Sequence, residues 1–142
     1  AGEILLACRD GAEQKKFATI VIQESSRLHK LVDDLALIST LETTNISLDE
    51  KIILDDLFIQ IESKIRGRRE LKQLQIIRDG DFSLQIQGNF YWLLQAFYNL
   101  LHNAVEFSPQ FGVINVAALK DDNGVRIQIQ DQGPGIPEWA KD

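Results

Sequence analysis

Apolar residues recur at helical spacing through the first third of the chain. Six of them share one face of the predicted helix and are here called the seam: Phe17, Val21, Leu28, Leu31, Leu35 and Ile38. From Leu28 onward the steps alternate between three and four residues, which is the pattern of a helix that packs along another helix. The pattern predicts a helix from about Glu13 to Glu42.

The segment before this helix predicts part of another one. Glu3 to Cys8 has the pattern of the end of an earlier helix, and the Arg-Asp-Gly sequence at 9–11 is a turn signal, since glycine can adopt a positive φ. We therefore predict a partial helical hairpin with its loop at Arg9 to Lys16. Because a lone amphipathic helix is marginal in water, we expect the seam to pack against a partner, most simply a second copy of the chain.

The periodicity changes after residue 43. Alternation over Ile46 to Leu48 predicts a short strand, and helical spacing returns from Leu54 to Leu74. Two further strands are predicted at Gln75 to Arg78 and at Phe82 to Gln87. The Asp-Gly pair at 79 and 80 predicts that these two strands form a hairpin, since it is a common turn sequence.

A last helix and two strands complete the pattern. The helix is predicted from Phe90 to Phe107, and the strands, Val113 to Leu119 and Val125 to Gln130, are joined by a turn at residues 121–124. The second strand alternates between apolar and polar residues. The chain is thus predicted to be an α+β fold: residues 1–43 form the helical hairpin segment, and residues 44–142 form a two-layer domain with helices on one face of a mixed or antiparallel sheet.

Composition limits the possible functions. With 142 residues, 44% apolar and 25% charged, the chain is typical of one soluble domain, or of one domain and part of another. The net charge of −6 argues against a general nucleic-acid binder, because such proteins carry excess positive charge. The single cysteine, Cys8, excludes an internal disulfide framework and a multi-cysteine zinc site, and is consistent with a reducing compartment.

The sequence shows no pattern typical of secretion or of a membrane span. No apolar run approaches the ~20 residues needed to cross a bilayer, and no secretory signal pattern opens the chain. The sequence contains no methionine, so we expect a cut, processed or engineered fragment, with any membrane-spanning part of the natural protein outside it.

Basic residues gather toward the end of the predicted helix from Leu54 to Leu74. They are Lys64, Arg66, Arg68, Arg69 and Lys72. We interpret this basic patch as a solvated helix face rather than as a binding site.

The helix from Phe90 to Phe107 carries the first candidate chemistry. It is apolar nearly all round, as expected of a buried helix, apart from one polar stripe: Gln95, Asn99, His102, Asn103 and Glu106. Asn99 and Asn103 present two carboxamides about one turn apart, and a carboxamide oxygen suits a hard cation such as Mg²⁺. The stripe equally fits a polar surface over the core, and the pattern alone leaves both interpretations open.

The second candidate is the segment from Asp131 to Pro137, directly after an alternating strand. Gly133 and Gly135 allow a sharp turn and let a flat ligand approach without meeting a Cβ atom. Asp131 offers a carboxylate acceptor beside them. Gly-Pro-Gly after a strand is usually only a turn, but here it follows an asparagine-lined helix, which is a rarer combination.

These motifs resemble those of the sensor histidine kinases of two-component systems. Asn99 to Ala104, continuing to Pro109, is similar to their N box, and Asp131 to Pro137 is similar to their first glycine box. Arg27 to Glu42 resembles the second helix of their dimerisation and histidine-phosphotransfer hairpin. The three motifs occur in the expected order and cover most of the chain.

The resemblance implies a reaction and its partners. The family's catalytic domain is an α/β sandwich of the histidine kinase, topoisomerase and chaperone ATPase type. It uses ATP and Mg²⁺ to phosphorylate a histidine in the hairpin, and the phosphoryl group then passes to an aspartate of a response regulator. The resemblance also implies a homodimer through the hairpin, and a location in the soluble cytoplasmic portion of a bacterial inner-membrane sensor.

The resemblance also implies roles for individual residues. Asn103 would be the Mg²⁺ ligand, and Asn99 would help to place the phosphates and the metal. Asp131 would accept a hydrogen bond from the adenine amino group, with Gly133 and Gly135 shaping the floor of the base pocket.

Two positions depart from the family pattern. The family often has lysine or arginine three residues after the second asparagine, whereas this chain has Glu106. An acid there would repel a triphosphate unless it is turned away or bridged by metal. The adjacent aromatic residue, often tyrosine, is Phe107. Both changes bear on the strength of phosphate binding.

No residue of the chain is assigned as the phosphoacceptor. We expect that histidine before Ala1 and the glycine-rich lid of the family after Asp142. His29 lies beside the seam without the family motif around it, and His102 is interpreted as a group near the metal site rather than as a nucleophile. Because a lid completes such a site, we expect the chain alone to bind nucleotide weakly or not at all.

Other functions stay open at this point. Related ATPases place a glutamate one turn before the metal-binding asparagine to activate water, but here that position is Asn99, whose carboxamide cannot take a proton. A serine kinase of the anti-sigma type shares both boxes but lacks the helical hairpin that the seam predicts. A degenerate kinase that acts only as a dimeric binding module is kept open by Glu106.

Overall fold

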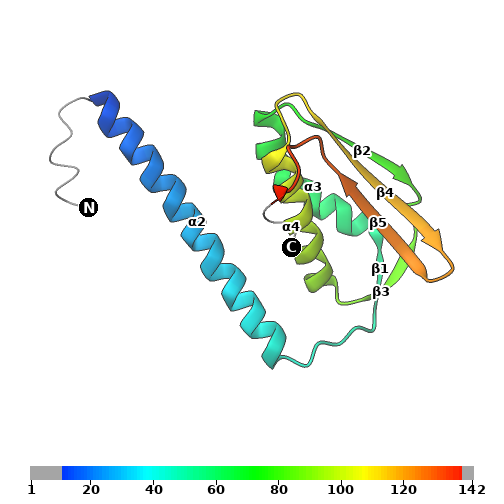
Figure 1. Cartoon of the computed structure of the whole chain (residues 1–142). Helices are drawn as coiled ribbons and strands as arrows, with labels where there is room; N and C mark the ends of the chain where they lie inside the picture. Colours follow the sequence, from blue (N-terminus) through cyan, green and yellow to red (C-terminus); the bar gives the residue numbers. More distant parts are fainter. Residues whose placement is uncertain (1–10, 139–142) are drawn as a thin grey trace. The chain divides into compact units, whose positions relative to one another are not determined.

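The computed structural model describes residues 11–138, and the chain divides after residue 46 into two compact units. The first unit consists of one long helix, α2 (Gly11–Thr43), shown in Figure 1. The predicted helix is confirmed, but the predicted loop at residues 9–16 is wrong from Gly11 onward, because α2 already includes those residues. Good helix formers and an acidic residue in the first turn, Glu13, favour this early start. The predicted end of an earlier helix, Cys8 included, lies outside the described residues.

The seam lies exposed along α2. Five of its six side chains are between 50 and 66% exposed, namely Val21, Leu28, Leu31, Leu35 and Ile38. No described residue of α2 is buried. The helix therefore gains nothing from tertiary packing within its own unit, and its predicted partner stays a prediction.

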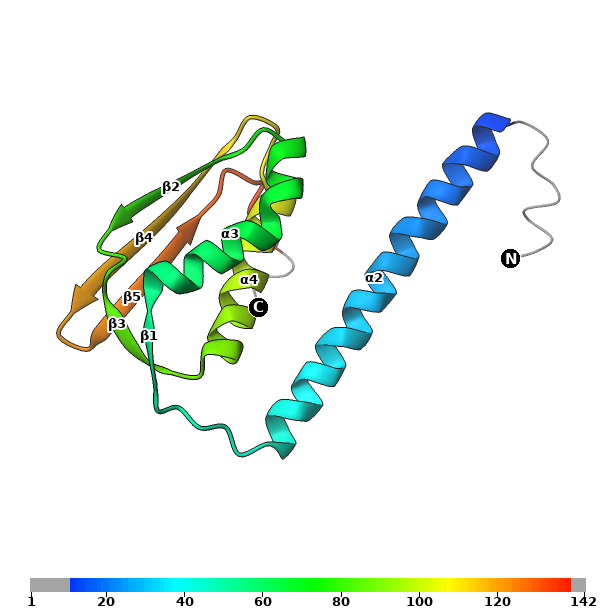
Figure 2. The ribbon, with the colours of Figure 1, turned by 180° about the vertical axis from the view of Figure 1, so that it is seen from behind.

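The second unit is an α+β domain built on a mixed sheet. Its elements are β1 (Glu50–Ile53), α3 (Leu54–Leu71), β2 (Gln75–Gly80), β3 (Gln85–Gly88), α4 (Phe90–Phe107), β4 (Val113–Asp121) and β5 (Gly124–Gln130). The main sheet has the order β2-β4-β5, with β2 parallel to β4 and β4 antiparallel to β5. Figures 1 and 2 show α3 and α4 together on one face of this sheet. The predicted two-layer fold is confirmed.

The hydrophobic core lies between the two helices and the sheet. Alternate residues of β4, namely Ile114, Val116 and Ala118, are buried against the helices. Phe58 of α3 is fully buried and meets the Phe82 ring edge-on, with 5.2 Å between the centroids. This burial is the main stabilising term for the sheet and helix layers.

One predicted strand and one predicted hairpin are wrong. The first strand is Glu50–Ile53 rather than 46–48, because only these residues lie opposite β3, with Ile52 paired to Ile86. The hairpin predicted at residues 79 and 80 does not form, since β2 pairs with β4 and β3 pairs with β1. Gly80 serves a different purpose: its φ is +88°, and a Cβ atom there would lie 2.1 Å from the carbonyl oxygen of Ala118.

Helix α3 ends at Leu71, three residues before its predicted end. Gln73 adopts a φ of 51°, and its N–H donates to the carbonyl of Glu70, while the N–H of Leu74 donates to the carbonyl of Arg69. These two bonds form a Schellman motif, a left-handed termination that usually carries glycine at this position.

Helix α4 begins and ends where predicted. The Asn89 side chain accepts a hydrogen bond from the N–H of Trp92 and caps the N-terminus. The interpretation of α4 as buried nearly all round is wrong, however. Only Leu101, Ala104 and Val105 are buried, because α4 covers the sheet from one side and leaves its outer face open.

Candidate functional site

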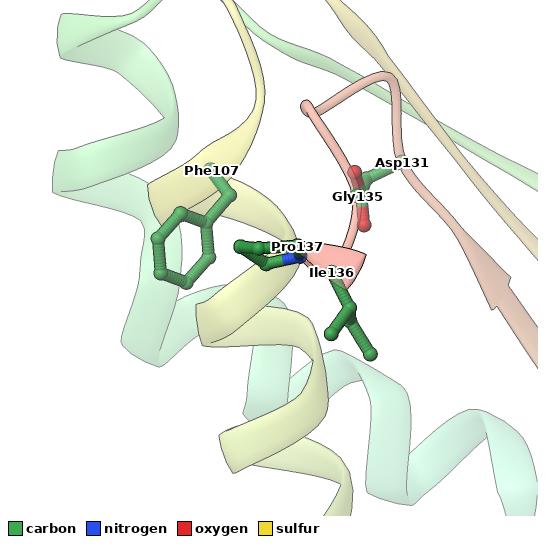
Figure 3. A pocket seen from close by; sticks show the side chains of 5 residues that line it. All are labelled: Phe107, Asp131, Gly135, Ile136 and Pro137. Atoms are coloured by element: carbon green, nitrogen blue, oxygen red, sulfur yellow. The ribbon is translucent and has the colours of Figure 1, made fainter. Parts of the chain in front are cut away.

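A cavity of about 280 Å³ lies between the end of α4 and the loop that follows β5. It is lined by Phe107 from α4 and by Asp131, Gly135, Ile136 and Pro137 from the loop, as Figure 3 shows. The lining therefore combines an aromatic ring, aliphatic groups and a single carboxylate. Such a surface suits a flat, mostly apolar ligand that carries a hydrogen-bond donor.

The Asp131 carboxylate has one engaged oxygen and one available oxygen. Its Oδ1 accepts a hydrogen bond from the N–H of Gly133 at 2.6 Å, which holds the turn of the loop. Its Oδ2 has no hydrogen-bond partner among residues 11–138. Asp131 therefore lines the cavity with one carboxylate oxygen that can still accept a hydrogen bond.

Gly133 and Gly135, the two predicted glycines, have different structural roles. A Cβ atom at Gly133 would lie 2.8 Å from the carbonyl oxygen of Phe107, so glycine lets the loop approach the end of α4. Gly135 has a φ of +74° and open space around it, so glycine is needed there for its backbone conformation. Gly135 lines the cavity, whereas Gly133 holds the loop to the cavity wall.

The intervening Gln132 ties the loop to the sheet. Its Oε1 accepts a hydrogen bond from the N–H of Val113, the first residue of β4, at 2.8 Å. The backbone at Gly112 passes close by, since a Cβ atom there would lie 3.4 Å from the same Oε1. The loop is therefore fixed at both sides of Asp131, by β5 before it and by Gln132 after it.

The structure divides the predicted polar stripe of α4. Asn103 is exposed, Asn99 is half-buried, and neither carboxamide forms a hydrogen bond within residues 11–138. Both lie on the face of α4 that continues into Phe107, because residues four apart stack along a helix. Glu106 instead turns toward α3, where Arg68 binds it at 2.9 Å.

The basic patch of α3 is largely engaged within the domain. Arg68 pairs with Glu106, Arg69 lies 4.0 Å from Glu62, and Lys72 donates to carbonyl groups at the end of α4. Arg68 stays 54% exposed, as expected of a solvated helix face, whereas Arg69 and Lys72 are half-buried and depart from that interpretation. Arg66, which is exposed, is the residue of the basic patch that best fits a solvated helix face.

Comparisons with known proteins decide the family. The sequence model of the histidine kinase-, DNA gyrase B- and HSP90-like ATPases matches residues 88–141, the stretch that contains α4 and the cavity loop. The phosphate regulon sensor protein PhoR of Pseudomonas aeruginosa is 30% identical over 115 residues, which cover 80% of this chain and 26% of PhoR. Residues 88–141 thus match this ATPase family, and most of the chain is similar to sensor histidine kinases.

Solved structures of histidine kinases share the fold. ThkA, in complex with the response regulator protein TrrA, matches with a TM-score of 0.75 and 21% identity, covering 95% of this chain and 40% of that one. ShkA, solved in full length in complex with AMPPNP, matches with a TM-score of 0.67 and 26% identity, covering 96% and 30%. The chain spans between 20 and 36% of the length of the curated sensor kinases that it matches.

Neither His29 nor His102 is among the residues that line the cavity. His29 is exposed on α2, and its Nδ1 lies 2.9 Å from the carbonyl oxygen of Ser25. His102 is half-buried on α4, with its ring centroid 5.6 Å from that of Tyr98.

The residues present fit a Mg²⁺ ion only in company with other ligands. Within residues 11–138 no cluster of histidine, cysteine or carboxylate side chains could hold a metal by itself. The carboxamide oxygens of Asn99 and Asn103 are of the hard type that Mg²⁺ accepts, and such an ion usually completes its shell with phosphate and water.

Phe107 is the cavity residue whose role the sequence reasoning missed. It was noted only as a departure from the more common tyrosine, although it forms one wall of the cavity. Its position four residues after Asn103 could have indicated this wall.

Among the described helices, none is both long and apolar enough to span a membrane.

Proposed function

We propose that the chain is the part of a sensor protein-histidine kinase that binds ATP, with the adenine in the cavity between α4 and the loop at residues 131–137. The kinase would use ATP to phosphorylate a histidine and pass the phosphoryl group to a response regulator. The AMPPNP complex of the similar kinase ShkA supports a nucleotide as the ligand.

The observation that carries this proposal is the free carboxylate oxygen of Asp131 in an apolar cavity. Oδ1 is engaged by Gly133, which leaves Oδ2 to accept from the exocyclic amino group of adenine. Guanine carries a carbonyl oxygen at the corresponding position, so a carboxylate would repel it. Phe107, Ile136 and Pro137 supply apolar contacts for the faces of the base.

The asparagine face of α4 would receive the phosphates. Asn103, exposed and without a hydrogen-bond partner among the described residues, would bind Mg²⁺, with Asn99 beside it. The ion, when bound, would neutralise phosphate charge and fix the orientation of the triphosphate. The carboxamide of Asn99 cannot act as a general base, which favours phosphoryl transfer over ATP hydrolysis.

Two protein partners are proposed, a second copy of the chain and a response regulator. The exposed seam of α2 is proposed to pack against the same helix of a second copy, because so much apolar surface is rarely left in water. The complex of ThkA with TrrA supports a response regulator as the protein partner of the kinase. A monomer at high concentration in light scattering would exclude the dimer.

The kinase proposal is tested with the natural protein that contains this chain. Incubation with labelled ATP and Mg²⁺ should yield a phosphoprotein whose label is lost in acid and retained in base, as expected of phosphohistidine. Asn103→Ala should abolish the label, and Asn123→Ala, in the turn between β4 and β5, should not. No label at saturating ATP would refute the proposal.

A further inference from the structure

The lysine that directly follows α3, Lys72, holds the end of α4. The Lys72 Nζ donates to the carbonyl oxygens of Val105 at 2.9 Å, of Ser108 at 3.0 Å and of Glu106. An ammonium group has three donors, so all three are used on one turn of one neighbouring helix. Lys72 is half-buried, which keeps these bonds largely out of competing water.

This contact satisfies carbonyl groups at the end of α4. The last carbonyls of a helix have no partner within it, and the partial negative charge there favours a cation. Helix α4 has no basic residue in its own last turn. Lys72 therefore supplies from α3 the cation that α4 lacks.

The turn that Lys72 holds is also the wall of the cavity. Phe107 lies between two of the carbonyl groups that Lys72 binds, and it lines the cavity. The loop passes so close to the Phe107 carbonyl oxygen that a Cβ atom at Gly133 would lie 2.8 Å from it. Any shift of this turn must therefore displace either the aromatic wall or the loop that carries Asp131.

The backbone of Lys72 adds a second attachment. Its carbonyl oxygen accepts from the N–H of Phe111 at 2.9 Å, in the segment that joins α4 to β4. The carbonyl of the next residue, Gly112, accepts from the N–H of Gln75. Side chain and backbone of one residue thus fix both the end of α4 and the connection that leads to Gln132.

We propose that Lys72 is a positioning residue of the nucleotide site. It sets the distance between Phe107 and the loop at residues 131–137, and thereby the width of the cavity that receives the purine. The identity of the ligand rests on the proposed function, whereas the positioning can be measured without any ligand.

The test compares Lys72→Met with Arg66→Met, which removes the same charge from an exposed site of the same helix. Two quantities are measured: ATP affinity by NMR titration, and amide hydrogen exchange without ligand at Gly133, with Ile114 of the core as reference. Lys72→Met should weaken ATP binding about tenfold, within the range that remote residues reach. It should also speed exchange at Gly133 relative to Ile114.

The controls separate positioning from general stability. Arg66→Met should leave both quantities unchanged, and Lys72→Arg should recover part of the ATP affinity because it keeps the charge and the donors. If Lys72→Met does not fold, Lys72→Gln is judged by the same criteria. Wild-type ATP affinity in a folded Lys72→Met or Lys72→Gln protein would overturn the inference. If the unaltered natural protein that contains this chain binds no ATP, the proposed function fails, and the Gly133 exchange rates still decide whether Lys72 positions the wall.

Discussion

Arg68 of α3 and Glu106 of α4 form an ion pair, with 2.9 Å between Nη2 and Oε2 and 3.0 Å between Nε and the same oxygen. The acid that departs from the family pattern is therefore turned toward α3 and compensated. The two side chains are 54 and 40% exposed, so the pair contributes at most about 1 kcal/mol to stability. Its larger consequence is electrostatic, because it removes an uncompensated negative charge from the asparagine face.

The ion pair predicts a coupled effect on ATP affinity. Arg68→Met should weaken ATP binding, because the freed Glu106 carboxylate would repel the phosphates. Arg68→Met combined with Glu106→Gln should restore most of the affinity, since no free charge remains. Calorimetric titration of the four proteins of this cycle gives the coupling. Equal losses in the single and double variants would show that Glu106 does not face the phosphates.

Asp131→Asn tests the adenine contact. The amide can still accept from the N–H of Gly133, so the turn should persist, but it places a donor where Oδ2 now lies. ATP binding should weaken by roughly 1.5 to 3 kcal/mol, the worth of a charge-assisted hydrogen bond. Asp122→Asn, at the other end of β5, is the matched control. The assignment fails if the unaltered protein binds GTP as well as ATP.

Gly133, Gly135 and Gly67 should respond differently to alanine: the first two substitutions should destabilise the domain and the third should stabilise it. Gly133→Ala should destabilise the domain by about 1 to 3 kcal/mol, because its Cβ would overlap backbone atoms of Phe107. Gly135→Ala should cost about 1 to 2 kcal/mol, since only its left-handed conformation is strained. Gly67→Ala in α3 has free space and should stabilise by about 0.5 to 1 kcal/mol. Urea unfolding measures all three, and a neutral Gly133→Ala would contradict the close approach.

Gln73→Gly should stabilise the domain. Gln73 has a φ of 51° at the end of α3, where a side chain costs roughly 1 to 2 kcal/mol that glycine avoids. The greater entropy of glycine in the unfolded chain offsets part of this gain. A net increase in the free energy of unfolding is expected, and a decrease would show that the left-handed termination is not populated in solution.

The sequence predicted the elements whose signals are local. Helix α4 has a capping asparagine, Asn89, and a Ser-Pro pair after its last residue, and both of its ends were predicted correctly. The turn between β4 and β5 was also found, because Asn123 and Gly124 mark it. The end of α3 was missed because Gln73 occupies a position where glycine is the usual signal.

Pairing between distant strands was not predictable in the same way. The Asp-Gly pair at 79 and 80 has the same local chemistry in a hairpin as at the end of a parallel strand, and only the contact with Ala118 distinguishes the two. In the site, Asp131 and Gly135 were placed at the cavity from their motif alone. The contacts of Lys72 and Arg68 with α4 depend on how two helices pack, which no local pattern specifies.

The most direct test of the central claim is NMR shift mapping of ATP on the labelled chain, which also detects weak binding. The account predicts that ATP with Mg²⁺ shifts the amides of Phe107, Asp131, Gly133 and Gly135, that Asn103 responds through its side-chain amide, and that GTP produces none of these shifts at equal concentration. Shifts confined to another surface, or the same response to GTP, would contradict an adenine site at this cavity.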